Sequence, residues 1–334
     1  MKKIAYLGMG AWGYCLASML ASNPEHAVVC WTTHPDLASH LAAGGAHPRL
    51  PSRPPHKNMR FTTNMAEALE GADMIVESVT SAGLRSVLEQ AKALEMGRAF
   101  FVITSKGIEQ DSGKILPEVA LQVLGEEFRS YIGCLSGPSF ADDVIRFLPT
   151  SVVGSGYSLE AIKEICTTFT TPYFRVYPNT DLLGVAFGGA LKNIIGIGCG
   201  ISEGLALGSS SKAALMTRGL HEIRKLAIAC GCKSDTISGL SGMGDLCATC
   251  SSSISRNFRF GLLLAEGFSS EEAQRKIGMV VEGAYTCVSA LQLSAKKQIP
   301  MPITEAVYQI IQGNIQPIDA VRALMQRSVK EEHL

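Results

Sequence analysis

The stretch Lys3-Ile-Ala-Tyr-Leu-Gly-Met-Gly-Ala-Trp-Gly13 decides the fold of the first half of this chain. Its apolar start, Lys3–Leu7, predicts a buried strand, and the sequence after it, Trp12–Leu20, predicts a helix. Between them the glycines follow the pattern Gly-x-Gly-x-x-Gly. Such glycines permit a tight turn and let backbone N–H groups at a helix N-terminus approach a pyrophosphate. Between a strand and a helix, this pattern predicts a dinucleotide-binding site.

Strand and helix patterns alternate through the rest of the first half, and helical patterns alone fill the second. We expect strands at Ala27–Thr32, Met74–Val79, Ala99–Thr104, Tyr131–Leu135, Ser151–Val153 and Phe174–Tyr177, with a helix at Leu84–Leu94. Beyond Asp181 we expect helices at Ser211–Cys230, Asn257–Ala265, Ser270–Ile277, Ala284–Lys297, Thr304–Gln312 and Ile318–Val329. The predicted fold is α/β: an N-terminal Rossmann-like doubly wound sheet over residues 1–180, followed by an all-α domain over residues 181–334.

Composition argues against several classes of protein. The 334 residues carry 30 Lys and Arg against 30 Asp and Glu, and this balance argues against a nucleic-acid-binding protein. The ten cysteines are scattered, and Cys247-Ala-Thr-Cys250 lacks the second pair that a zinc site needs. We therefore interpret the cysteines as reduced thiols and expect no metal. No secretory signal opens the sequence, so we expect a cytoplasmic protein.

One long apolar stretch, from Leu182 to Ser202, resembles a membrane span. Its glycines dilute the hydrophobicity, and Lys192 lies in its middle, where a charge in a bilayer costs most. We interpret the stretch as a buried helix, with no membrane span.

The end of the second predicted strand bears on the choice of cofactor. NAD-selective sites usually place an acid about 20 residues after the glycines, where it bonds the ribose 2′-hydroxyl. Here the strand ends Trp31-Thr-Thr-His34, and the first acid, Asp36, comes later. Either NADP is accepted, or Asp36 or a backbone group serves NAD; the sequence leaves both open.

Polar residues follow two later strands, at the sheet edge where ligands bind. Lys106 lies in Thr104-Ser-Lys-Gly107, and its ammonium suits an anion or a nicotinamide. Gly137 and Ser139 lie in Ser136-Gly-Pro-Ser-Phe140, and they offer an N–H and a hydroxyl to a ligand at the same edge of the sheet. Taken alone, the first motif is an ordinary surface lysine, whereas for the second a simple turn and a ligand contact are equally good interpretations.

The helical half holds the candidate proton-transfer group. Lys192, followed by Asn193, lies on a glycine-rich apolar helix, where an ammonium is costly unless it is paired or functional. Burial moves a lysine pKa toward neutrality, which suits proton exchange with an alkoxide. Asp245, in a predicted loop at Gly242-Met-Gly-Asp245, is its candidate partner.

A second cluster in the helical half suits a phosphate. Ser255-Arg256-Asn257 stands at a predicted helix start, and it combines a serine cap, a guanidinium and an amide with the positive end of a helix dipole.

Together these motifs resemble the NAD(P)-dependent glycerol-3-phosphate dehydrogenase family. The resemblance spans nearly the whole chain, through Gly8–Gly13, Ser105–Gly107, Ser136–Ala141, Gly188-Gly-Ala-Leu-Lys-Asn193, Gly242–Asp245, Ser255–Asn257 and Val280–Gly283. It implies an oxidoreductase that interconverts sn-glycerol 3-phosphate and dihydroxyacetone phosphate with NAD or NADP and supplies glycerol 3-phosphate for phospholipid synthesis. The expected partner is the phosphorylated three-carbon substrate, and a homodimer stays open.

The resemblance also assigns roles to residues. It implies that Lys192 donates and accepts the proton, with Lys106 and Asp245 beside it as catalytic residues. The implied substrate contacts are Lys106, Gly137, Ser139, Lys192, Asn193, Asp245, Ser255, Arg256 and Asn257. The implied nucleotide contacts are Gly8, Gly10, Ala11, Trp12, Gly13, Thr33, His34, Lys106, Ala141, Arg256, Val280 and Glu282.

This sequence departs from the family pattern at two positions. Ala11 stands where the family often has serine, so a hydroxyl contact to phosphate is lost. Thr33 stands where it often has arginine or histidine, which leaves the 2′-phosphate contact to the neighbouring His34.

Two other classes of protein remain as alternatives. A 3-hydroxyacid or 6-phosphogluconate type of dehydrogenase would share the glycine motif but lack Ser255-Arg256-Asn257 beside Lys192. A non-catalytic nucleotide sensor would not need Lys106, Lys192 and Asp245 together.

Overall fold

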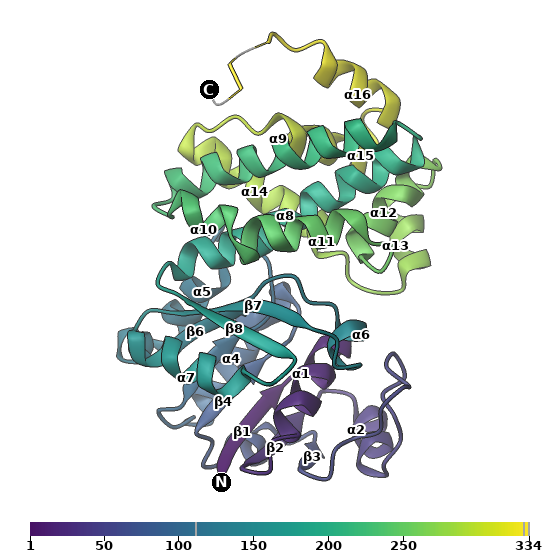
Figure 1. Cartoon of the computed structure of the whole chain (residues 1–334). Coiled ribbons are helices and arrows are strands. Elements are labelled where there is room, and N and C mark those ends of the chain that lie inside the picture. Colours follow the sequence, from purple (N-terminus) through teal and green to yellow (C-terminus); the bar gives the residue numbers. More distant parts are fainter. Residues whose placement is uncertain (111, 330, 333–334) are drawn as a thin grey trace. The chain divides into compact units, whose positions relative to one another are not determined.

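The chain folds into two units, which the computed structural model describes over residues 1–110, 112–329 and 331–332 (Figure 1). The sheet unit comprises Met1–Ser105 and Leu116–Leu182, and the helical unit comprises Lys106–Ile115 and Leu183–Leu334. The sequence predicts two continuous domains, whereas the short segment Lys106–Ile115 leaves the first half of the chain to join the helical unit.

An eight-stranded sheet forms the centre of the sheet unit, in the order β3-β2-β1-β4-β5-β6-β7-β8. The strands are β1 (Lys2–Leu7), β2 (His26–Trp31), β3 (Met59–Thr62), β4 (Met74–Glu77), β5 (Phe100–Ile103), β6 (Ile132–Ser136), β7 (Thr150–Gly156) and β8 (Phe174–Asn179). Adjacent strands are parallel except β6 and β7, which are antiparallel. This confirms the predicted doubly wound, largely parallel sheet.

The register brings the carboxyl ends of the central strands to one level. Leu7 at the end of β1 is paired with Trp31 of β2 and with Glu77 of β4, and Glu77 is paired with Ile103 of β5. The loops that begin at Gly8 and Thr104 therefore leave the same edge of the sheet, as ligand-binding loops do in this architecture.

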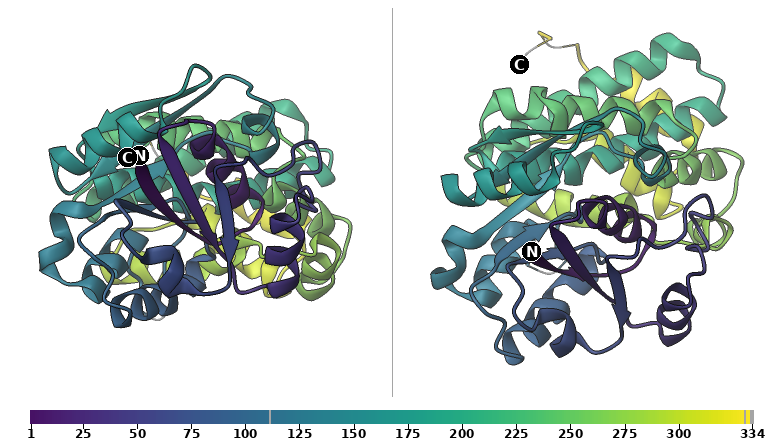
Figure 2. Two further views of the ribbon diagram at one scale, coloured as in Figure 1. Left: turned by 90° about the horizontal axis from the view of Figure 1, so that it is seen from below. Right: turned by 60° about the horizontal axis from the view of Figure 1, so that its bottom comes forward.

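Helices cover both faces of the sheet. In the sheet unit these are α1 (Ala11–Ala21), α2 (Pro35–Ala42), α3 (Met65–Leu69), α4 (Leu84–Ala93), α5 (Leu116–Leu124), α6 (Ala141–Val144) and α7 (Leu159–Phe169). Ile4 and Tyr6 of β1 pack with α1 in one core cluster, whereas the alternate residues Ala5 and Leu7 are buried on the other face, where α3 contacts β1. Figure 2 shows α1 against the first strands from two further directions.

The helical unit is built around one long buried helix, α8. Its helices are α8 (Leu182–Gly204), α9 (Gly208–Ala229), α10 (Ser234–Ser238), α11 (Asp245–Ser251), α12 (Arg256–Ala265), α13 (Ser270–Ile277), α14 (Glu282–Lys297), α15 (Pro302–Ile311) and α16 (Pro317–Met325). By length and mean hydropathy of 1.6, α8 is the one described helix that could cross a membrane, yet 89% of its most apolar window is buried within this structure. The helix α16 ends before the predicted end at Val329.

Glycines on α8 let neighbouring helices approach closely. A Cβ added at Gly200 would lie 2.0 Å from the Phe258 carbonyl oxygen of α12, and one at Gly196 would lie 2.7 Å from Cγ2 of Thr249 on α11. Small residues at these positions therefore allow α11 and α12, which carry Asp245 and Arg256, to pack directly on the helix that carries Lys192.

Candidate active site

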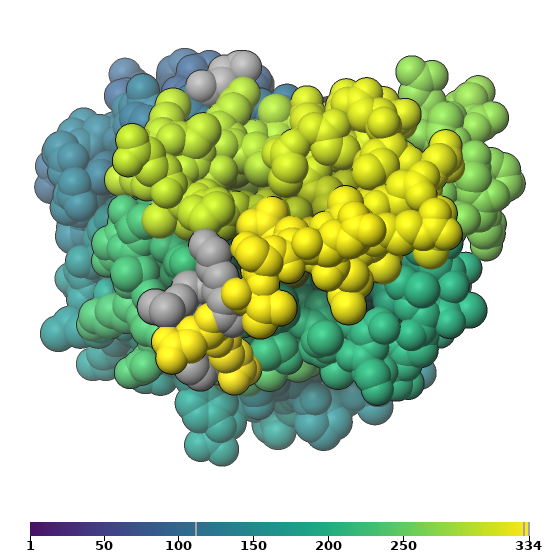
Figure 3. Space-filling view, turned by 90° about the horizontal axis from the view of Figure 1, so that it is seen from above, coloured from purple at the N-terminus to yellow at the C-terminus, as the bar shows by residue number. Residues whose placement is uncertain are grey.

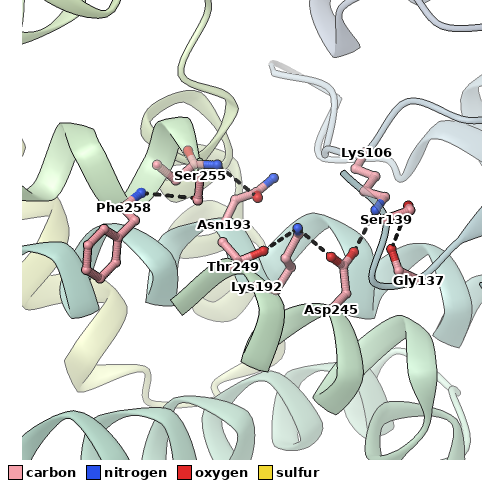
Figure 4. Close-up of polar contacts among 10 residues, drawn as sticks. Lys106, Gly137, Ser139, Lys192, Asn193, Asp245, Thr249, Ser255 and Phe258 are labelled. Carbon is pink, nitrogen blue, oxygen red and sulfur yellow. Dashed lines mark hydrogen bonds and ion pairs between the residues drawn. The ribbon is translucent and has the colours of Figure 1, made fainter. Parts of the chain in front are cut away.

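Lys192 lies in the interior of the helical unit, held by two acceptors. Only 8% of its surface is exposed, because α8 is buried over most of its length. Its Nζ donates to Oδ1 of Asp245 at 2.7 Å and to Oγ1 of Thr249 at 2.6 Å (Figure 4). The buried ammonium is thus paired, as its position on an apolar helix requires.

Asp245 connects this lysine to a second one. Its Oδ2 accepts from Nζ of Lys106 at 2.6 Å, so the carboxylate bridges two ammonium groups (Figure 4). The prediction that Asp245 lies in a loop was wrong. A π-helical turn, Leu240–Gly244, continues directly into α11, and Asp245 is the first residue of that helix. The helix fixes the backbone of Asp245, and so it fixes the direction of the carboxylate more firmly than a loop would.

The charges of this cluster set the protonation of Lys192. Burial lowers the pKa of Lys192 to about 8; Asp245 opposes that shift, and the nearby positive charge of Lys106 adds to it. With both lysines protonated, two positive charges face one negative charge. The cluster therefore has a positive surplus that suits an anionic reactant, and Lys192 can release its proton near neutral pH.

Two asparagines fix the backbone around this cluster. Nδ2 of Asn257 donates to Oδ1 of Asn193 at 2.9 Å, and Oδ1 of Asn257 accepts from the Gly283 N–H at 3.0 Å. Both side chains are buried. These bonds connect α8, α12 and α14 through the residue next to Lys192, and they explain why asparagines stand in these places.

The start of α12 holds the predicted phosphate cluster. Ser255 is the N-cap, and its Oγ accepts from the Phe258 N–H at 3.3 Å, which confirms the predicted cap (Figure 4). The adjacent Arg256 side chain is exposed and donates from Nη1 to the Val280 carbonyl at 2.9 Å. Val280 is half-exposed, and Glu282 begins α14. The helical unit thus brings Arg256, Val280 and Glu282 together.

The glycine-rich turn of the sheet unit has space for a phosphate group. A Cβ at Gly13 would lie 2.0 Å from the Gly8 carbonyl oxygen, and Gly8 has φ +102°, so both positions require glycine. A Cβ at Gly10 would meet no atom within 4 Å. No side chain caps α1, and its first turn has no acid, so the N–H groups of Ala11 and Trp12 are available to an anion.

The other predicted residues of the sheet unit stand at its strand ends. Thr33 and His34 are exposed just after β2, and Ala141 begins α6. Gly137, with φ +145°, follows β6, and a Cβ there would lie 2.9 Å from Cα of Val152. The Ser139 hydroxyl donates to the Gly137 carbonyl at 3.0 Å.

Sequence reasoning missed two buried polar residues of these sites. Thr249, 1% exposed, accepts a hydrogen bond from Lys192. Its position one helical turn after Asp245 could have indicated that both side chains lie on the same face of a helix. Glu77, 0% exposed, accepts from the Ser105 hydroxyl at 2.5 Å and from the Thr104 N–H at 3.2 Å. In the sequence, Glu77 could have been noticed as a carboxylate at the end of an apolar strand. Its hydrogen bonds fix the backbone just before Lys106.

Comparison with known proteins agrees with this architecture. Residues 3–161 match the family profile described as NAD-dependent glycerol-3-phosphate dehydrogenase N-terminus, and residues 181–322 match that of the C-terminus. This chain belongs to the NAD-dependent glycerol-3-phosphate dehydrogenase family. The family resemblance and the fold expected from the sequence are therefore confirmed, and membership decides against the other two-domain dehydrogenases.

Individual relatives align over their full lengths. A glycerol-3-phosphate dehydrogenase [NAD(P)+] of Protochlamydia amoebophila is 72% identical, with 100% of both chains covered. One of Chlamydia abortus is 52% identical, covering 100% of this chain and 99% of the relative. The crystal structure of glycerol-3-phosphate dehydrogenase from Coxiella burnetii is 36% identical, covers 98% of this chain and 99% of that one, and superposes with a TM-score of 0.92.

Proposed function

We propose that this protein interconverts sn-glycerol 3-phosphate and dihydroxyacetone phosphate with NAD or NADP. The observation that carries the proposal is the buried cluster in which Lys192 and Lys106 share the Asp245 carboxylate. A ketone reductase needs an acid that protonates the developing alkoxide, and a lysine with a pKa of about 8 serves both directions of the reaction.

The sheet unit fits the nucleotide. Gly8, Gly10 and Gly13 leave a space at the N-terminus of α1 that a side chain would fill, and the N–H groups there suit a pyrophosphate. In our proposal Thr33 and His34 face the ribose end, and Ala141 and the helical-unit residues Lys106, Arg256, Val280 and Glu282 complete the contacts. A bound reduced nicotinamide supplies the hydride that reduces the ketone carbon.

The residues of the chain then handle the proton. The Lys192 ammonium donates a proton to the oxygen of the former carbonyl, and Asp245 holds that ammonium in place from the start of α11. Thr249 fixes its orientation from one turn further along the same helix. Lys106 adds positive charge that stabilises the alkoxide as its charge develops. In the reverse direction the neutral amine of Lys192 takes the proton from the alcohol.

The same proposal places the substrate phosphate at the start of α12. The Arg256 guanidinium and the positive end of the helix at Ser255 attract a dianion, and Asn193 and Asn257 position the backbone beside it. Gly137 and Ser139 are the proposed contacts from the sheet unit. Phosphate binding remote from the reacting carbon orients the ketone.

The cellular setting is also part of the proposal. We infer a cytoplasmic enzyme, assembled as a homodimer, whose product feeds phospholipid synthesis. Family membership supports the reaction, and the location rests on the expectation from the sequence. The homodimer is a proposal that the sequence leaves open.

The test is a direct assay of the purified protein. Oxidation of NADH and of NADPH is followed by absorbance with dihydroxyacetone phosphate, and with unphosphorylated dihydroxyacetone as the control for phosphate recognition. We expect turnover with the phosphorylated ketone and far slower turnover with the control. Nucleotide binding without turnover would instead support a sensor.

A further inference from the structure

We infer that a groove between α9, α15 and α16 binds the anion of an unbranched aliphatic carboxylic acid. The groove has a volume of about 810 Å³ and lies entirely within the helical unit. In Figure 3 the yellow residues near the C-terminus lie beside the green residues of α9 along this face. The groove shares none of its lining residues with the cluster around Lys192.

The walls of the groove suit an alkyl chain. They are formed mainly by aliphatic side chains of α9, α15 and α16, with Ile201 from α8. Among them are Leu215, Ile303, Val307, Ile310, Leu324 and Met325. None of the described lining residues is Phe, Tyr or Trp, and His221 is the one aromatic side chain among them, so the lining is mainly aliphatic. Its volume lies in the range of about 300–1,000 Å³ that is typical of small-molecule sites.

The charges of the groove suit an anionic head group. Three of its described lining residues are cations, Arg218, Lys225 and Arg327, and one is an acid, Glu222. That acid is already used within the fold, because it accepts from the Ile303 N–H at 2.6 Å and from the N–H and the hydroxyl of Thr304, both at 3.2 Å. Arg218 donates to the Glu332 carbonyl, and the charge of Arg327 acts on Glu222. Three cations against one acid still leave the lining with a positive surplus, in which Lys225 is the cation without such an interaction among the described residues.

These charges favour a small anion over a second copy of the chain. In a symmetric dimer the same patch meets itself, so a groove lined by Arg218, Lys225 and Arg327 would meet a second positively charged groove. Like charges across an interface repel, whereas a carboxylate neutralises them. Lys225 is half-buried and lines the groove, so its ammonium can reach a ligand there.

The experiment is isothermal titration of the full chain with decanoate, below its micellar concentration and without nucleotide or substrate. We expect one saturable site per chain and no binding of decyltrimethylammonium, which has the same chain with the opposite charge. Lys225→Gln should weaken decanoate about threefold to tenfold, as loss of one partly screened charge contact does. Met325→Glu places a carboxylate at the rim and should abolish binding; because Met325 is 81% exposed, we expect this variant to fold.

Two matched variants on α16 serve as controls. Arg322, paired with Asp319, and Ile318 do not line the groove, so Arg322→Gln and Ile318→Glu should bind decanoate as the wild type does. Absence of saturable binding, equal binding of the cationic amphiphile, or unchanged affinity in Lys225→Gln and Met325→Glu would overturn the inference. If the wild type binds no decanoate and Met325→Glu breaks an oligomer, the groove is a contact between copies. None of these outcomes bears on the dehydrogenase proposal.

Discussion

Burial and two charged neighbours act in different directions on the pKa of Lys192. Burial disfavours its ammonium, Asp245 favours it, and Lys106 disfavours it. The result is a pKa of about 8, close enough to neutral pH for the same group to give a proton and to take one. A solvent-exposed lysine would stay protonated and would serve only one direction of the reaction.

Arg256→Ala should impair use of the phosphorylated ketone. The Arg256 side chain is exposed at the start of α12, where the phosphate is proposed to bind, and it donates to the Val280 carbonyl. Loss of a charge-assisted contact costs about 1.5–3 kcal/mol, so KM for dihydroxyacetone phosphate should rise on the order of tenfold to a hundredfold. Steady-state kinetics measure this, with Arg275→Ala on α13 as a control for removing a surface cation. An unchanged KM would place the phosphate elsewhere.

Thr33→Asp should shift the cofactor preference toward NADH. Thr33 is exposed just after β2 and carries no charge, so we expect the wild type to use NADH and NADPH within about tenfold, as one neutral hydrogen bond allows. A carboxylate there repels a 2′-phosphate, whereas Thr33→Asn, similar in shape but neutral, should not. The ratio of kcat/KM for the two cofactors measures the shift. A wild-type preference above about a hundredfold would mean that another residue discriminates.

At the scale of elements, close packing on α8 supports the site. Gly200→Ala would place a Cβ 2.0 Å from the Phe258 carbonyl oxygen, so α12 must move away from α8. Overpacking of this kind costs about 1–3 kcal/mol, and thermal unfolding should show a lower Tm. Gly97→Ala, where the Cβ meets no atom within 4 Å, is the control. Equal Tm values for the two variants would contradict this account of α8.

Glu222 makes the start of α15 sensitive to pH. Burial raises the pKa of Glu222 from 4.5 to about 7, although three hydrogen bonds from Ile303 and Thr304 oppose the shift. The folded chain holds this proton more tightly than the unfolded chain does. Its stabilising contribution is therefore complete below pH 4.5 and is lost as the pH rises through about 7.

Denaturant unfolding at pH 5 and at pH 7.5 tests this, since Glu222→Gln keeps an acceptor but cannot titrate. The free energy of unfolding should fall less between these pH values in Glu222→Gln than in the wild type, by on the order of a few kcal/mol. The exposed Glu305→Gln on α15 should behave as the wild type. Equal pH dependence in all three proteins would show that Glu222 is not the titrating group.

At the scale of the whole molecule, the periodicity of apolar residues predicted those strands and helices whose apolar side chains are buried in a regular pattern. The central strands β1, β2, β4 and β5 and the helices α12 and α13 lie where the sequence placed them, to within two residues. The edge strand β3 was missed because its four residues, Met59–Thr62, form a strand only by pairing with β2. The strand β7 was predicted at Ser151–Val153, but its antiparallel direction was not. That direction and the separate segment Lys106–Ile115 depend on contacts far apart in the sequence.

For the candidate site too, the sequence predicted some residues and missed others. The cost of burying an ammonium pointed to Lys192 and to a carboxylate partner, and Asp245 lies within hydrogen-bonding distance of it. Thr249 was missed because Asp245 was expected in a loop, so the residue one helical turn later on α11 was not expected to face Lys192. The roles of these residues and the cofactor preference stay predictions until they are measured.

The most direct test of the central claim is the pH dependence of kcat/KM in both reaction directions, in the wild type and in Lys192→Ala. With Lys192 as acid and base, ketone reduction should fall as pH rises through about 8, because the ammonium is lost, and alcohol oxidation should rise over the same range. Lys192→Ala should bind nucleotide normally and lose about 10²–10⁴-fold in rate, along with both transitions. Profiles that are flat or move together in the wild type, or a variant within a few-fold of its rate, would contradict the assignment of Lys192.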